Sequence, residues 1–144
     1  MTDTLIDAGP LVAVVNRNDT NHRAAAALLR ELNCPFTTTL PAITEAMYLA
    51  HARLGLRAQQ ALWKMLLRGD LILEHPTGED LSRMHELMTK YADLPMDFAD
   101  ASLVAIAERL NLSRILTLDR DDFSVYRLHN RTPLLVIAPP LPSS

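Results

Sequence analysis

Five acidic residues stand where their carboxylates could meet at one edge of a folded domain: Asp7, Glu45, Asp97, Asp100 and Asp119. Asp7 and Asp119 follow short apolar runs that are typical of strands, and Glu45 lies in the first turns of a predicted helix. Asp97 and Asp100 open the alanine-rich segment DFADASLVAIAERL. Carboxylate oxygens without paired cysteine or histidine ligands select a hard ion, Mg²⁺ or Mn²⁺. The five acids therefore raise the question of a metal site.

Each of these acids also has a purely structural interpretation. Asp97 and Asp100 fit the N-cap and N3 positions of a capped helix, and Glu45 suits the positive end of a helix dipole. Asp7 could cap the next helix, and Asp119 could form an Asx-turn. Together the acids favour a bound cation, because like charges about 5 Å apart at an effective dielectric of about 20 repel by roughly 3 kcal/mol per pair.

Strands alternate with helices along the chain, a pattern that favours a parallel sheet with right-handed crossovers. The expected strands cover residues 4–8, 35–39, 71–75, 114–118 and 134–138. The expected helices cover residues 10–16, 19–32, 41–55, 57–70, 79–93 and 97–111. Asp19 or Thr20 should open the second helix, and Gly55 and Gly69 should end the third and fourth. We therefore predict an α/β fold, a three-layer α/β/α sandwich with a central parallel sheet of about five strands. Ligands of such sheets gather beyond the carboxyl ends of the strands.

Length and composition indicate one globular domain, since 49% of the 144 residues are hydrophobic and 22% are charged. We expect this domain over residues 1–138 and a frayed tail over 139–144. The single cysteine, Cys34, cannot form an internal disulfide and is expected to be a small core residue, which fits a cytoplasmic protein. We find no signal peptide and no run near the roughly 20 apolar residues that span a bilayer, so no membrane contact is expected. A net charge of −3 argues against a basic protein that binds nucleic acid through a large positive surface.

Four fragments of the chain, in this order, resemble the PIN-domain nucleases, and among them the VapC-like toxins of type II toxin–antitoxin pairs. The fragments are LIDAGPLVAVVNRNDTNHRAA, TTLPAITEAMYLA, DFADASLVAIAERL and ILTLDRDDF. The resemblance covers nearly the whole chain and implies a PIN-like fold. It also implies an acidic pocket of Asp7, Glu45, Asp100 and Asp119, with Asp97 as an accessory acid. Whether Asp121 or Asp122 contributes stays open at this point. Many relatives carry Ser or Thr one or two positions after the first aspartate, where this chain has Ala8 and Gly9.

The reaction that this resemblance implies is hydrolysis of RNA phosphodiester bonds within the chain, with Mg²⁺ or Mn²⁺ as cofactor. Asp7 and Asp100 would hold an ion that lowers the pKa of a bound water, and Glu45 and Asp119 would position a second ion or that water. Basic side chains could guide the substrate strand, namely Arg17, Arg23, Arg53, Arg57 and Arg120. We expect His22 to have a surface or helix-packing role.

The resemblance further implies two protein partners, a second copy of the chain in a homodimer and a small cognate antitoxin. The two helices over residues 41–70 offer a surface for them, with apolar side chains at Ala46, Leu49, Leu62, Trp63, Leu66 and Leu67. The alternative that these side chains all pack inside the domain stays open.

Two other functions use comparable features. A receiver-type phosphorylation switch needs an aspartate after the third strand and a lysine after the fifth, but those strands are followed by HPTGED and PP. A catalytically silent PIN-like RNA-binding or protein-binding module is the remaining alternative, because a complete acidic pocket does not by itself prove turnover.

Overall fold

The computed structural model describes residues 4–33, 35–94 and 96–139. A five-stranded sheet lies at its centre, in the order β3-β2-β1-β4-β7, and neighbouring strands all run parallel. These strands are β1 (Thr4–Ile6), β2 (Phe36–Thr39), β3 (Leu71–Glu74), β4 (Arg114–Leu116) and β7 (Leu135–Ile137). All five lie within the ranges predicted from the sequence, so the predicted central parallel sheet is confirmed.

Six helices follow the prediction closely. They are α1 (Ala8–Val15), α2 (His22–Leu32), α3 (Leu40–Leu54), α4 (Leu56–Arg68), α5 (Gly78–Lys90) and α6 (Phe98–Leu110). Gly55 and Gly69 end α3 and α4 as expected, both with positive φ (78° and 83°), a conformation that glycine adopts without steric cost. The predicted cap of α2 is wrong, because its N-cap is Asn21. The carboxylate of Asp19 instead accepts the Asn21 N–H at 2.8 Å in an Asx-turn ahead of the helix.

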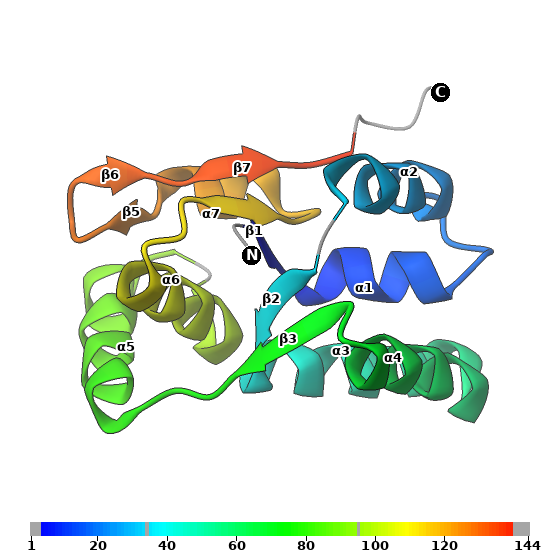
Figure 1. The fold of residues 1–144 in the computed structure, drawn as a ribbon. Coiled ribbons are helices and arrows are strands. Elements are labelled where there is room, and N and C mark those ends of the chain that lie inside the picture. Colours follow the sequence, from blue (N-terminus) through cyan, green and yellow to red (C-terminus); the bar gives the residue numbers. More distant parts are fainter. Residues whose placement is uncertain (1–3, 34, 95, 140–144) are drawn as a thin grey trace.

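Helices cover both faces of the sheet (Figure 1). Alternate residues along a strand belong to different apolar clusters. Leu5 and Ile115 pack with α5 and α6, whereas Ile6 and Leu116 pack against α1, α3 and α4. This alternation follows from the two-residue period of a strand, and it gives each face its own apolar core. The three-layer α/β/α sandwich is therefore confirmed.

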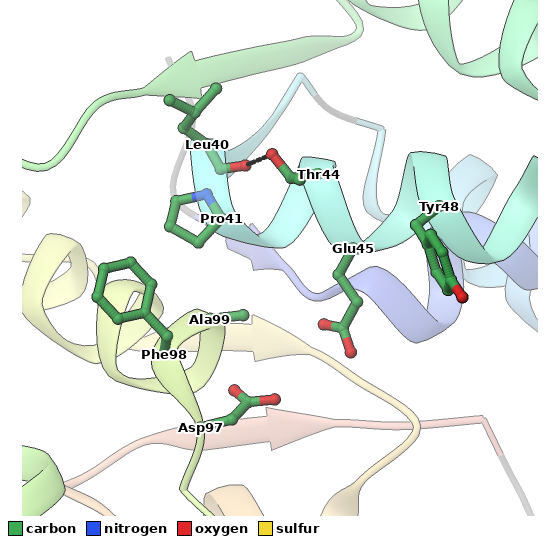
Figure 2. A pocket seen from close by; sticks show the side chains of 8 residues that line it. All are labelled: Leu40, Pro41, Thr44, Glu45, Tyr48, Asp97, Phe98 and Ala99. Carbon is green, nitrogen blue, oxygen red and sulfur yellow. Dashed lines mark hydrogen bonds between the residues drawn. The ribbon is translucent and has the colours of Figure 1, made fainter.

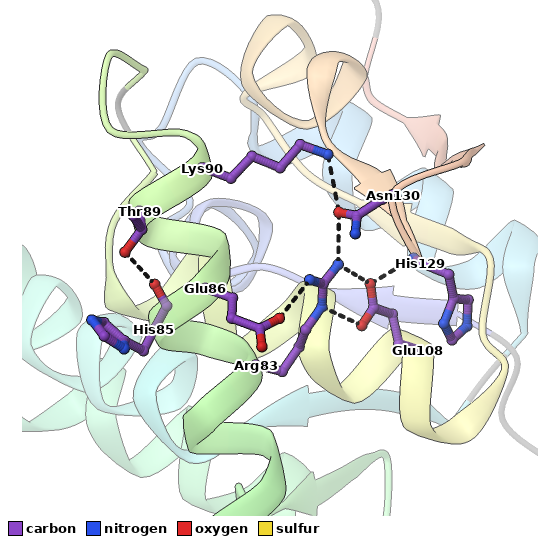
Figure 3. Close-up of polar contacts among 8 residues, drawn as sticks. All are labelled: Arg83, His85, Glu86, Thr89, Lys90, Glu108, His129 and Asn130. Atoms are coloured by element: carbon purple, nitrogen blue, oxygen red, sulfur yellow. Dashed lines mark hydrogen bonds and ion pairs between the residues drawn. The ribbon is translucent and has the colours of Figure 1, made fainter.

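Three short elements near the C-terminus were not predicted: α7 (Arg120–Val125), β5 (Arg127–Leu128) and β6 (Thr132–Pro133). β5 and β6 pair antiparallel in a separate hairpin. Figure 3 shows how this hairpin is fixed to the helices. Glu108 of α6 accepts two hydrogen bonds from Arg83 of α5, at 2.8 and 3.0 Å, and one from the His129 N–H at 2.7 Å. Asn130 accepts hydrogen bonds from Arg83 and Lys90.

The apolar residues over 41–70 divide between core and surface. Ala46 and Leu62 are buried in the domain, whereas the side chains of Trp63 and Leu67 are 51% and 80% exposed on α4. The interpretation that all of them pack inside the domain is therefore wrong. Among the described residues, no helix is long and apolar enough to cross a bilayer. Cys34 and residues 140–144 of the predicted tail lie outside the described residues.

Candidate active site

Asp7 lies where the strand order of the sheet reverses. The strand that follows β1 in sequence, β2, lies on one side of it in the sheet, and β4 lies on the other side. The boundary between β1 and β4 is therefore a switch point, the place where open α/β sheets typically bind ligands. Asp7 directly follows β1 and is the N-cap of α1, and its Oδ1 accepts the Ala8 N–H at 2.8 Å. Its Oδ2 accepts a hydrogen bond from the Thr117 hydroxyl, just after β4, at 3.1 Å. The carboxylate is 5% exposed and held in one orientation.

Asp97 and Asp100 form a capping box at the start of α6. The Asp97 carboxylate accepts the Asp100 N–H at 2.8 Å, and the Asp100 carboxylate accepts the Asp97 N–H at 3.4 Å. The structural interpretation of this pair is therefore confirmed. Capping does not remove them from the candidate site, because both residues also line a pocket that Asp7 lines. Each acid can fix the helix with one oxygen and present the other to the pocket.

This pocket, which we call the acidic pocket, has a volume of about 290 Å³. Its lining contains all five acids singled out from the sequence, together with Asp122: Asp7, Ala8, Gly9, Glu45, Leu49, Asp97, Asp100, Asp119 and Asp122. The acids come from five places in the fold, namely the end of β1, α3, the start of α6, the residues after β4, and α7. Asp121, its sequence neighbour, is exposed and lines another pocket. Of the two residues left open by the sequence, the structure thus brings Asp122 to the site.

Burial and repulsion between neighbouring acids raise the pKa of Asp7, Glu45, Asp100 and Asp119 in the acidic pocket. Burial is the larger cause for Asp7, whose pKa rises to about 6, with Glu45 and Asp119 adding repulsion. The pKa of Asp100 rises to about 8, because burial is reinforced by the charges of Asp97 and Asp7. The pKa values of Glu45 and Asp119 are raised in the same way, first by burial and then by neighbouring acids. The site therefore concentrates negative charge that solvent screens poorly.

Two residues that support the acids were not assigned roles from the sequence. The Thr117 hydroxyl accepts a hydrogen bond from the Asp119 N–H at 2.9 Å and donates one to the Asp7 carboxylate. One side chain therefore orients both acids. Threonine two residues before an aspartate is a turn-forming pattern, and this signal was available. Tyr126 is fully buried, and its hydroxyl contacts Asp100 Oδ2 at 3.4 Å. Nothing local in the sequence links these two residues, which are 26 positions apart.

Ala8 and Gly9 follow the first aspartate of the site, and packing explains the glycine. A Cβ on Gly9 would lie 3.2 Å from two side-chain carbons of Leu118, closer than most carbon contacts. Glycine therefore lets α1 approach the residues after β4. Neither Ala8 nor Gly9 carries a hydroxyl, and Thr117 supplies one to Asp7 from the neighbouring strand end.

The donor set of the acidic pocket fits a hard divalent cation. Its side-chain donors are carboxylate oxygens only, and two of the carboxyls are buried with raised pKa values. A cation would compensate their buried charge and relieve the repulsion between them. The ligands are not preassembled, however. Within the part of the chain that the structure describes, no three His, Cys, Asp or Glu side chains form a group that could hold a metal ion.

None of the predicted RNA-guiding arginines lines the acidic pocket, and Arg120 lines a neighbouring pocket together with Asp119 and Asp122. Arg53 forms a long ion pair with Asp19 at 4.0 Å, and Arg120 donates to the Ala138 carbonyl. Arg17 and Arg57 line a separate pocket between α1 and α4. His22 Nδ1 lies 2.8 Å from the carbonyl oxygen of Ala13, which joins α2 to α1 and agrees with the expected helix-packing role.

The family model described as PIN domain matches residues 4–128 of this chain. The chain therefore belongs to the PIN-domain family. Among relatives, Ribonuclease VapC26 of Mycobacterium tuberculosis is 28% identical over 123 residues, which are 85% of this chain and 91% of the relative.

Two solved structures resemble the fold. Mycobacterium tuberculosis VapC20, described as a toxin that cleaves the sarcin–ricin loop, matches with a TM-score of 0.71 and 22% identity, over 78% of this chain and 86% of that chain. A chain of VapBC2 from Rickettsia felis, solved with a DNA fragment from their promoter, matches with a TM-score of 0.63 and 14% identity, over 96% and 98%. At these identities the likenesses establish the PIN fold.

Proposed function

We propose that this chain is a Mg²⁺- or Mn²⁺-dependent endoribonuclease. The observation that carries the proposal is that Asp7, Glu45, Asp100 and Asp119 line one acidic pocket at the switch point of a PIN fold. The similarity to a ribonuclease over most of both chains supports RNA as the substrate. The proposed domain covers residues 1–138, because β7 completes the sheet beyond the matched family region.

The proposed roles follow from how each acid is held. Asp7 and Asp100 are the main metal ligands, and Glu45 and Asp119 orient the attacking water or a second ion, with Asp97 as an accessory acid. When bound, the metal offsets charge on the scissile phosphate and lowers the pKa of a water. Thr117 keeps Asp7 and Asp119 oriented through its two hydrogen bonds. The buried Tyr126 contacts Asp100 Oδ2 through its hydroxyl and so helps to orient that carboxylate.

We further propose that the chain is the toxin of a toxin–antitoxin pair and acts in the cytoplasm, where its RNA substrate lies. The VapC names of its relative and structural neighbours support this role. The proposed partners are a small antitoxin and a second copy of the chain, with Trp63 and Leu67 of α4 as exposed apolar contacts. Light scattering at tens of micromolar tests the homodimer. Co-expression with the adjacent small open reading frame tests the antitoxin, which should relieve growth arrest.

The experiment that tests nuclease function is cleavage of a structured RNA pool by purified protein, with and without EDTA. Cleavage should require Mg²⁺ or Mn²⁺ and should be lost in Asp7→Asn and Asp100→Asn. Asp121→Asn is the matched control, since this exposed acid adjoins Asp122 but does not line the acidic pocket, and it should cleave normally. A folded wild-type protein that binds RNA without cutting it would favour the silent RNA-binding module instead.

A further inference from the structure

An open apolar groove adjoins the acidic pocket. It has a volume of about 620 Å³, and its walls are the first turns of α3 and of α6 (Figure 2). The residues lining it are Leu40, Pro41, Thr44, Glu45, Tyr48, Asp97, Phe98 and Ala99. Glu45 and Asp97 also line the acidic pocket, and Figure 2 shows their carboxylates directed toward each other. The groove and the acidic pocket therefore share one border.

Two aromatic side chains from different helices line the groove. Tyr48 of α3 is 73% exposed and Phe98 of α6 is 52% exposed, although each ring could bury a large apolar area. The walls that carry them are fixed to each other, because the hydroxyl oxygens of Thr39 and Ser102 lie 2.6 Å apart where α3 meets α6. Exposed rings on a rigid, mostly apolar surface are typical of binding sites.

The charges of the groove select what can bind there. Its described lining includes no lysine or arginine but does include two carboxylates, so a phosphate group would be repelled. An uncharged planar ring has no such penalty, and it can stack on an aromatic side chain. The surface therefore suits a nucleobase and disfavours the sugar–phosphate backbone.

We propose that this groove is a nucleobase subsite, in which Tyr48 and Phe98 stack an unpaired base of RNA next to the phosphodiester positioned at the acidic pocket. The inference rests on the proposed nuclease function and adds to it a separate binding site for a base beside the acidic pocket. The shared border at Glu45 and Asp97 is what places base and phosphodiester side by side.

Binding measured apart from cleavage tests this proposal. The anisotropy of a fluorescein-labelled single-stranded RNA is titrated with the Asp7→Asn protein in Mg²⁺, and then with the same protein carrying Tyr48→Ala or Phe98→Ala. Each aromatic substitution should weaken binding about tenfold, the loss typical of one stacked base. Tyr48→Phe keeps the ring and should restore binding. Leu81→Ala, at an exposed apolar residue of α5 that does not line the groove, should have no effect.

Three results would overturn the subsite. If the wild type cleaves RNA but the two alanine variants bind RNA as tightly as their parent, the subsite is wrong and the nuclease function stands. If the wild type neither binds nor cleaves RNA, both proposals fail together. If light scattering shows a dimer that Tyr48→Ala or Phe98→Ala converts to a monomer, a second copy of the chain covers the groove.

Discussion

The Thr117 hydroxyl donates a hydrogen bond to Asp7 Oδ2 at 3.1 Å and so joins the ends of β4 and β1 across the centre of the sheet. This bond lowers the pKa of Asp7 against the larger effect of burial. The same oxygen accepts the Asp119 N–H, so removal of the hydroxyl leaves a backbone donor without its acceptor.

We expect Thr117→Val to lower kcat/KM for RNA about tenfold, the loss typical of one hydrogen bond to a charged group. Because the pKa of Asp7 then rises further, the ascending limb of the pH–rate profile should move to higher pH. Thr117→Ser restores the hydroxyl and should restore both quantities. A Thr117→Val protein with an unchanged profile would show that the hydroxyl does not orient Asp7.

Metal-free protein should lose stability as pH rises. The pKa of Asp7 is raised from 3.8 to about 6 and that of Asp100 to about 8, so between pH 4 and 8 the folded state holds protons that the unfolded chain has released. The free energy of unfolding should therefore fall over this range, by about 3 kcal/mol from Asp7 alone, and level off above it. Urea unfolding in EDTA at several pH values measures this.

Asp7→Asn and Asp100→Asn should flatten that pH dependence and be no less stable than the wild type at pH 8, because each removes a repelled buried charge. Asp121→Asn should keep the wild-type slope. If either pocket variant unfolds well below the metal-free wild type at pH 8, its carboxylate is chiefly a helix cap.

Mg²⁺ should stabilise the wild type, since an ion bound only by the folded state adds about 2.7 kcal/mol at a hundred times its Kd. The midpoint of thermal unfolding should therefore rise with Mg²⁺ in the wild type and stay constant in Asp100→Asn. Equal shifts in the two proteins would place the bound ion away from the acidic pocket.

The Arg83–Glu108 pair offers a stability test remote from the acids (Figure 3). Glu108→Ala removes the acceptor of two Arg83 hydrogen bonds and of the His129 N–H. We expect a loss of about 2 kcal/mol in the free energy of unfolding, with RNA cleavage retained at temperatures where the protein stays folded. Urea unfolding and the cleavage assay measure the two quantities, and a loss of cleavage in the folded variant would contradict this separation.

The sequence was most informative where local chemistry and periodicity agree. The strands are short apolar or β-branched runs before a turn or cap, and the glycines at the ends of α3 and α4 are specific stop signals. The candidate acids could be found because they follow strands or lie near the starts of helices. Asp121 and Asp122 could not be separated, since only the phase of the short helix α7 turns one of them toward the acidic pocket. The contact of Tyr126 with Asp100 depends on tertiary packing and leaves no pattern in the sequence.

The central position of β1 has a consequence for the chain during synthesis. Asp7 is made before the other acids of the pocket, and its partner Thr117 lies 110 positions later. The acidic pocket therefore cannot exist on a ribosome-bound chain until β4 and the residues after it have emerged and paired with β1. A break between β3 and β4 would likewise divide the carboxylates between two fragments, so that the complete set would form only when the fragments associate.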